Sequence, residues 1–173
     1  MAELEQRTND AIESYLNTVR LGRALIQGGV IIDSLVGSAV DAIGLADLAR
    51  LAPNLDAKQS RDVATALEPV ESRRESVGAI LDREHAWSRR TFGLKGQIGR
   101  LLAFKSVKQG EQRAVAKIRA QQIRSRILLI QLASHAYELE KGERPKSIAD
   151  LVPAYLKAIP QDPVTGTNLL YRP

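Results

Sequence analysis

The segment from Glu111 to Lys141 is the feature that most limits what this chain of 173 residues can fold into. Its apolar residues recur at helical spacing and predict the longest helix of the chain. Between Ile127 and Ala136 that helix is apolar nearly all round. A helix of this kind has to be covered on most sides, so we expect it to be the central helix of the fold.

The end of this helix is equally well marked. Gly142 is a natural C-terminal stop, and Pro145 prevents the helix from continuing. Pro153 and Pro160 then interrupt the chain, and the run 162–166 has the composition of a turn. We therefore expect an extended, Pro/Gly-rich tail over residues 143–173 that packs back on the helices and can form a short β-hairpin.

The rest of the chain is also helical in composition. Aromatic residues are scarce, so Ala, Leu, Ile and Val must fill the core. Asp56 is a good N-cap, Pro69 is expected to open a new helix, and Gly93 begins a glycine-rich stretch that predicts a break or bend. Helices are expected at 3–27, 30–51, 57–67, 70–92 and 101–107.

The predicted fold is mainly α. Residues 1–142 are expected to form a five- or six-helix bundle with a long central C-terminal helix. The chain has the length of one domain of ordinary size, so we expect the bundle and the tail of residues 143–173 to form one structural domain.

The second expected helix has two contrasting faces. Gly37 and Gly44 share one face with Asp33 and Asp41, and the glycines would let a neighbouring helix approach closely. We expect the two aspartates to cap a helix or to pair with an arginine of the basic segment 89–126. Another face carries apolar residues: Ile32, Val36, Ala39, Ile43 and Ala46.

Charge is distributed unevenly along the chain. The formal net charge is +5, but residues 1–60 hold five basic and eight acidic side chains, whereas residues 89–126 hold eleven basic side chains and one acid. Such an excess can attract phosphates or anionic lipid. The residues that would bind a polyanion are Arg113, Lys117, Arg119, Arg124 and Arg126.

A solvated helix that pairs with the acidic N-terminal third is the preferred interpretation of the basic segment. Proteins that bind nucleic acid usually concentrate charge on one face or interleave it with exposed aromatic residues. Here we expect the nearby aromatic residues, Trp87, Phe92 and Phe104, to lie in the core.

Signals for catalysis or metal binding are weak. The chain has no cysteine, and the patterns of zinc proteases, nucleophile elbows and phosphate-binding loops are absent. Of the two histidines, His85 is expected to be solvated or ion-paired and His135 to be a hydrogen-bonded core residue. We assign no catalytic residue, cofactor or metal; an enzyme that uses Asp33, Asp41 or His135 remains an alternative.

No membrane segment is predicted. The first ten residues are polar and acidic, unlike a signal peptide. The most apolar stretch, 30–52, carries four charged side chains, which argues strongly against a membrane helix. We expect the chain itself to be soluble.

The tail and the helix before it resemble a known pattern. The matching residues are Tyr137, Gly142, Pro145, Leu151, Tyr155-Leu156, Pro160, Asp162-Pro163, Gly166 and Tyr171. Their order and spacing resemble the helix-to-loop junction of type II secretion major pseudopilins. The tail is also similar to the C-terminus of uncharacterised helical envelope proteins of Planctomycetes-type bacteria, as is the segment 29–51. This resemblance implies a place in the cell envelope.

The chain departs from pseudopilins in two respects. It lacks their long apolar N-terminal helix, so we do not expect a filament subunit. In the pseudopilins the loop matching Asp162 helps to bind calcium, but here no second carboxylate is near, and Asp162 is a weak calcium candidate. The preferred function is a non-catalytic structural or protein-interaction module of an envelope-associated protein, with a protein partner or self-association. Polyanion binding through residues 89–126 is the main alternative.

Overall fold

The computed structural model describes the backbone of residues 2–102 and 104–169 and the side chains of residues 5–93 and 105–169. Within these residues the fold is mainly α, as predicted. The helices are α1 (Ala2–Ile26), α2 (Ile31–Leu51), α3 (Ala57–Ser72), α4 (Val77–Leu102) and α5 (Phe104–Lys141), with short 3₁₀ helices η1 (Ala52–Asn54) and η2 (Ile148–Leu151).

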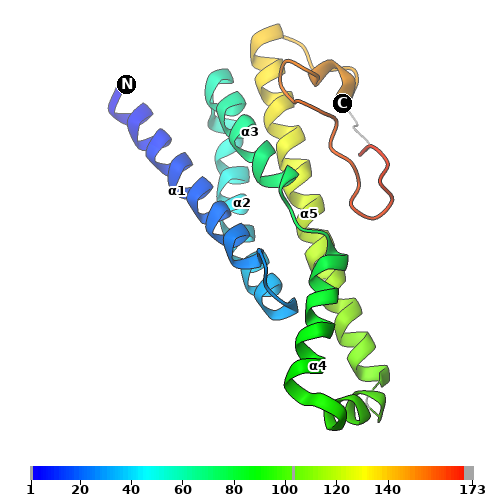
Figure 1. Ribbon diagram of the computed structural model, residues 1–173. Helices are drawn as coiled ribbons and strands as arrows, with labels where there is room; N and C mark the ends of the chain where they lie inside the picture. The colour runs from blue at the N-terminus through cyan, green and yellow to red at the C-terminus, as the bar shows by residue number, and fades with distance from the viewer. Residues whose placement is uncertain (1, 103, 170–173) are drawn as a thin grey trace.

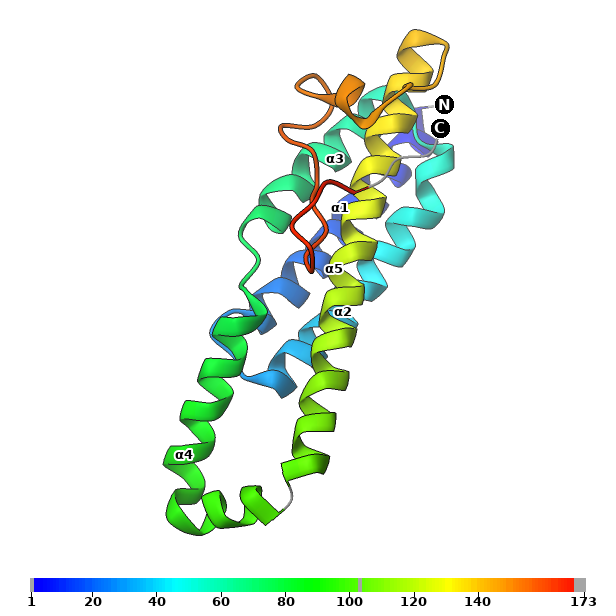
Figure 2. The ribbon, with the colours of Figure 1, turned by 90° about the vertical axis from the view of Figure 1, so that its right-hand side faces the viewer.

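The long helix α5 is the spine of the molecule. In Figure 1, α1 and α2 form an antiparallel hairpin, and α3 lies along the C-terminal half of α5. Figure 2 shows α4 running beside the N-terminal half of α5 and projecting beyond the α1–α2 turn. We call this projection, residues 77–120, the arm.

The core lies where the C-terminal half of α5 meets α1, α2, α3 and the tail. Leu132 and Ala136 of α5 are fully buried there, as the periodicity predicted, whereas Ile127 remains 44% exposed. The other fully buried leucines of this core are Leu48, Leu67, Leu151 and Leu156. The helix begins at Phe104, earlier than the predicted Glu111, because the single glycine at 110 costs only about 1 kcal/mol in a helix.

Glycines hold α1 and α2 close together, as the sequence predicts. A Cβ atom on Gly37 would lie 2.5 Å from the carbonyl oxygen of Gly22, and one on Gly22 would lie 2.5 Å from the backbone nitrogen of Asp41. A Cβ on Gly44 would lie 2.7 Å from the carbonyl oxygen of Tyr15. No other residue type fits at these three positions without moving the helices apart.

This contact decides which face of α2 points inward. The buried face carries small and polar side chains, among them Ser34, Ser38 and Asp41. The apolar face points outward, and Ile32, Val36 and Ile43 are 62%, 51% and 60% exposed. Burying the apolar face instead would place side chains where the backbones of α1 and α2 now touch.

Pro69 does not open a new helix, contrary to the prediction. It lies inside α3, which continues to Ser72. The extra turn is stabilised because it brings Glu71 into a buried cluster of ion pairs described below. The break comes four residues later, where the Ser76 hydroxyl accepts a hydrogen bond from the backbone N–H of Ala79 and starts α4.

The aromatic residues of α4 are not in the core, which corrects a second prediction. Trp87 and Phe92 are 48% and 53% exposed and touch edge to face, with ring centroids 5.7 Å apart. They lie on the arm, where a single helix covers α4 (Figure 2). The predicted bend is present: Gly93 has φ of +54° and kinks α4. The side chain of Phe104 lies outside the described residues.

The tail lies over the C-terminal half of α5 and α3. Leu151, Tyr155 and Leu156 belong to the core, and the Tyr155 hydroxyl donates to Glu140 Oε2 over 2.8 Å. Residues Gln161 and Asn168 form an isolated antiparallel bridge. This bridge is the only β-structure in the described part of the tail, so the predicted β-hairpin is not formed there beyond this single pair of residues.

No helix in the described part of the chain combines the length and the apolar character that crossing a membrane requires. This agrees with the prediction made from the charges in the most apolar segment.

Replacing Gly37 with alanine is expected to destabilise the protein by about 1–3 kcal/mol, because the new methyl group forces α1 and α2 apart. The matched control is Gly110→Ala in α5, which has open space around it and should stabilise by about 0.5–1 kcal/mol. Urea unfolding monitored by circular dichroism measures both values. Equal effects for the two variants would contradict the close contact.

Ending the chain at Arg144 removes three buried side chains, Leu151, Tyr155 and Leu156, from the core. We expect the shortened chain to lose at least about 3 kcal/mol of stability, since each such side chain contributes about 1.5–3 kcal/mol when buried. A thermal melt of both chains measures the loss. An unchanged melting temperature would show that the tail contributes nothing.

Candidate functional site

Three charged residues from three helices meet below the surface of the bundle. Asp41 of α2 is completely buried, and Glu71 of α3 is 8% exposed. Arg23 of α1 reaches both: its Nη2 atom lies 2.5 Å from Glu71 Oε1 and 3.2 Å from Asp41 Oδ2. The glycine contact between α1 and α2 is what places Arg23 opposite Asp41, since Gly22 lies against Asp41.

Two further arginines complete the cluster around Glu71. The Nη2 atom of Arg74 lies 2.7 Å from Glu71 Oε1, and the side chain of Arg74 is 5% exposed. The Nε atom of Arg126, in α5, lies 3.6 Å from Glu71 Oε2. We call Arg23, Asp41, Glu71, Arg74 and Arg126 the ion cluster.

Uncharged side chains of α5 also bind the carboxylates. Ser125 donates from Oγ to Glu71 Oε1 over 2.6 Å, and Gln121 donates from Nε2 to Asp41 Oδ2 over 3.3 Å. The cluster therefore ties α1, α2, α3 and α5 together by polar contacts. Such an arrangement favours one packing of the helices over others because each group has few alternative partners.

Burial strongly affects the ionisation of Asp41. Its pKa is raised from 3.8 to about 6, mainly by loss of solvent, and the nearby carboxylate of Glu71 makes the smallest contribution to this rise. The charge of Arg23 and the hydrogen bond from Gln121 act in the opposite direction but do not cancel the effect of burial. As the pH falls through about 6, protonation of Asp41 removes one negative charge from the ion cluster.

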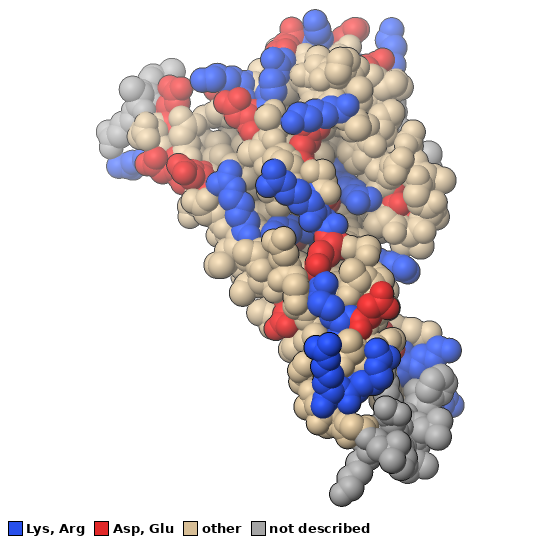
Figure 3. Space-filling view, in the orientation of Figure 1, with Lys and Arg blue, Asp and Glu red and all other residues tan. Residues whose placement is uncertain are grey.

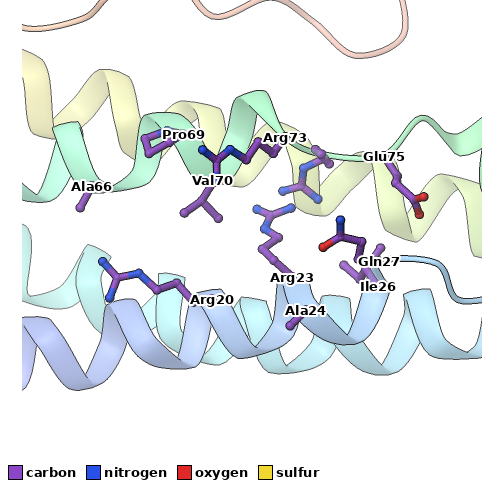
Figure 4. Close-up of a pocket in the computed structure, with 11 residues that line it drawn as sticks. Arg20, Arg23, Ala24, Ile26, Gln27, Ala66, Pro69, Val70, Arg73 and Glu75 are labelled. Carbon is purple, nitrogen blue, oxygen red and sulfur yellow. The ribbon is translucent and has the colours of Figure 1, made fainter.

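A cavity of about 420 Å³ opens beside the ion cluster, between α1 and the end of α3. Figure 4 shows Arg20 and Arg23 reaching into it from α1 and Arg73 from the opposite side. Its apolar wall consists of Ala24, Ile26, Ala66, Pro69 and Val70. Arg74 and Glu75 also line it.

The structure does not bring the three residues of the enzyme alternative together. Asp33 is exposed and accepts a hydrogen bond from the backbone N–H of Val30, which caps α2 as expected. Asp41 belongs to the ion cluster, and its arginine partners come from α1 and the end of α3, not from the basic segment. His135 is half-buried, with Nε2 3.1 Å from the carbonyl oxygen of Leu55.

The basic residues proposed for polyanion binding divide into two groups. Arg113, Lys117 and Arg124 are exposed on α5, whereas Arg119 and Arg126 are half-buried. Arg126 faces Glu71 and the carbonyl oxygen of Gln161. Figure 3 shows Lys and Arg side chains gathered on the lower part of the arm, below the last acidic side chains visible on that face.

Asp162 has a structural role in the tail. Its Oδ1 atom accepts hydrogen bonds from the backbone N–H groups of Thr165, at 2.9 Å, and Val164, at 2.7 Å, and these bonds lower its pKa. The described part of the chain contains no group of three or more acidic or histidine side chains that could hold a metal.

The other tail residues named from the sequence form its turns and anchors. Gly142 and Gly166 have φ of +74° and +71°, which only glycine adopts readily. Pro145 is fully buried, while Pro160 and Pro163 are half-buried. Tyr171 lies outside the described residues.

Most of the ion cluster was not predicted from the sequence. Glu71 was not among the predicted site residues, because the sequence gives no sign of whether Glu68 or Glu71 is the buried carboxylate. Arg23 carried a signal that could have been used: it follows Gly22 and lies one helical turn after Val19, which is buried. Arg74 carries no comparable signal.

No protein-family model, curated protein or solved structure matches this chain.

Replacing Asp41 with asparagine is expected to change the pH dependence of stability. Because the folded pKa is raised, Asp41 stabilises the fold fully below about pH 4, and that contribution is lost as the pH rises through 6. The free energy of unfolding of Asp41→Asn, relative to the wild type, should thus rise by roughly 3 kcal/mol from pH 4 to pH 7. Urea unfolding at each pH measures this difference, and a difference that does not vary with pH would contradict the raised pKa.

Proposed function

We propose that this protein is a non-catalytic interaction module that associates with a second copy of itself through the outer face of α2. The observation that carries the proposal is the exposure of Ile32, Val36 and Ile43, each more than half accessible on one side of one helix. Ala39 and Ala46 complete the row and are also exposed. We call these five residues the α2 stripe.

The spacing of the α2 stripe suits a partner helix. Successive members are four, three, four and three residues apart, which is the repeat of a helix seam. No charged residue lies along the middle of the exposed face: Asp41 is buried, and Asp33, Asp47 and Arg50 lie towards the ends of α2. An uncharged centre with charged ends is the usual composition of a protein interface.

A second copy is the partner that the stripe fits best. If two α2 helices pair antiparallel about Ala39, the small Ala39 faces itself, Val36 faces Ile43, and Ile32 faces Ala46. Large side chains then meet small ones at the end of the seam, and the same patch serves both copies, as a two-fold interface requires. Leu21 and Leu25 of the neighbouring α1 are also exposed and can widen the contact.

An envelope location is the part of the proposal that rests on the sequence resemblance alone, in the tail with the helix before it and in segment 29–51. The residues from Tyr137 to Gly166 that resemble pseudopilins and Planctomycetes-type envelope proteins support it.

Replacing Ile43 with glutamate should abolish self-association, because the charge would be buried against an apolar seam at a cost of at least ~3 kcal/mol, or more than 100-fold in dimer affinity. Ala49→Glu, also exposed on α2 but outside the stripe, is the matched control and should associate like the wild type. Sedimentation equilibrium measures all three proteins. A wild type that remains monomeric up to about 1 mM, or two variants that behave alike, would contradict the proposal.

Engineered cysteines test the orientation, since the chain has no cysteine of its own. Ala39→Cys should oxidise to a disulfide-linked dimer. Ile32→Cys mixed with Ala46→Cys should form the mixed dimer in preference to either self-pair. Self-pairing of Ile32→Cys would show a parallel arrangement instead.

A second candidate function, polyanion binding, is favoured by one observation on the arm. The basic segment was interpreted as a solvated helix, and not as a polyanion site, because its neighbouring aromatic residues were expected to be buried. Trp87 and Phe92 are instead about half exposed. Arg89 and Arg90 are exposed between them in the sequence. Basic side chains interleaved with exposed aromatic rings are the pattern that single-stranded nucleic acids prefer.

Fluorescence anisotropy with a labelled single-stranded oligonucleotide tests this candidate. Replacing both Arg89 and Arg90 with glutamine should weaken binding and reduce the salt slope by about one unit per lost phosphate contact. Arg50→Gln, exposed on α2, is the control and should leave both unchanged. Absence of binding by the wild type at about 50 mM salt would remove the candidate.

A further inference from the structure

Two buried guanidinium groups beside the α1–α3 cavity have incomplete hydrogen bonding. Arg74 uses its Nη2 atom on Glu71 and Asp41, but its Nε and Nη1 atoms are buried and have no hydrogen-bond partner. Arg23 has the same arrangement, with Nη2 on the carboxylates and Nε and Nη1 without a partner. Each arginine thus keeps three N–H donors unused in a place where unpaired donors are costly.

Both arginines line the cavity of about 420 Å³. A volume of this size accommodates a small organic molecule. The cavity is framed by Arg20 and Arg73 as well, and both are exposed (Figure 4). Four arginines therefore surround the cavity. The guanidinium groups of Arg23 and Arg74 are buried, whereas Arg20 and Arg73 lie at the surface. Arg20 and Arg23 belong to α1, and Arg73 and Arg74 follow the end of α3.

Charge at the cavity is in excess and positive. Glu75 is the acidic residue in its lining, and that carboxylate is already held by Arg83, whose Nη1 atom lies 2.8 Å from Glu75 Oε1. The two carboxylates of the ion cluster, Asp41 and Glu71, are shared among three arginines. An anion in the cavity would lie beside four arginines, two of which have buried donors without a hydrogen-bond partner in the described structure.

We infer that this cavity binds a small molecule that carries a phosphate group on an apolar body. Arginine forks match the oxygen atoms of a phosphate with paired hydrogen bonds, and two buried forks with two more at the surface suit a group of charge near −2. The apolar wall formed by Ala24, Ala66, Pro69 and Val70 would contact the body of the ligand. The site is separate from the α2 stripe and does not depend on self-association.

Phenyl phosphate is the probe, because it joins a phosphate to a small apolar body. Isothermal titration calorimetry at constant ionic strength should show binding of phenyl phosphate to the wild-type protein, weaker binding of inorganic phosphate and none of phenol. Binding of inorganic phosphate equal to or tighter than that of phenyl phosphate would overturn the apolar part of the inference. Failure of phenyl phosphate to bind at about 10 mM would overturn the site as a whole.

Exposed arginines provide variants that should fold normally. Arg20→Gln and Arg73→Gln are each expected to weaken phenyl phosphate binding at least tenfold. Arg124→Gln, which removes an equally exposed charge from α5 away from the cavity, is the matched control and should bind like the wild type. An equal loss in all three variants would mean a general attraction between charges and would overturn the inference.

Two further measurements keep the outcome decisive. Arg74→Lys retains the charge but not the fork, and circular dichroism checks that it folds; if folded, it should also lose at least tenfold in affinity. The second measurement is binding to vesicles that contain phosphatidic acid. If the protein binds these vesicles but not phenyl phosphate, the phosphate it recognises belongs to a lipid surface, and the inference of a small-molecule ligand is overturned.

Discussion

The close approach of α1 and α2 is the constraint on which the rest of this structure depends. Gly22, Gly37 and Gly44 let the two backbones touch, and any side chain at these positions would meet backbone atoms within 3 Å. The approach has two consequences. It brings Arg23 of α1 within reach of Asp41 of α2, and it leaves no room between the two helices for Ile32, Val36 and Ile43, which therefore point outward.

Polar contacts then do in this protein part of what apolar packing does in most helical bundles. Four helices contribute to the network around Asp41 and Glu71, and the cost of burying these charges is visible in the raised pKa of Asp41. Replacing a buried ion pair by apolar residues often leaves stability unchanged or higher, so the network is better explained by specificity than by stability. It sets the register of α1 against α2 and α3, and it leaves unused arginine donors beside a cavity.

Much of the architecture followed from the sequence, because helix length and helix ends have strong local signals. The long helix, its stop at Gly142, the cap at Asp56 and the glycine contact of α2 were all predicted correctly. One error concerns a helix end, since Pro69 lies inside α3 instead of opening a new helix, and the others concern burial. Glu71 is buried and Trp87 is exposed, and in both cases the deciding factor is which helix lies opposite, a property of the tertiary arrangement that residue type and spacing do not contain. The ion cluster was missed for the same reason, since its members are separated by up to about a hundred residues.

The arm and the rest of the molecule should differ strongly in the free energy of local unfolding. In the arm, the buried apolar residues among the described side chains are Ile80, Ala114 and Ile118. The C-terminal half of α5, in contrast, packs against three helices and the tail. Local unfolding costs least where few apolar contacts are lost. Backbone amides of α4 and of the start of α5 should therefore exchange with solvent through small openings, while those around Leu132 exchange only on global unfolding. One continuous helix would thus belong to two cooperative units, with Gln121 and Ser125, the partners of the buried carboxylates, near the boundary between them.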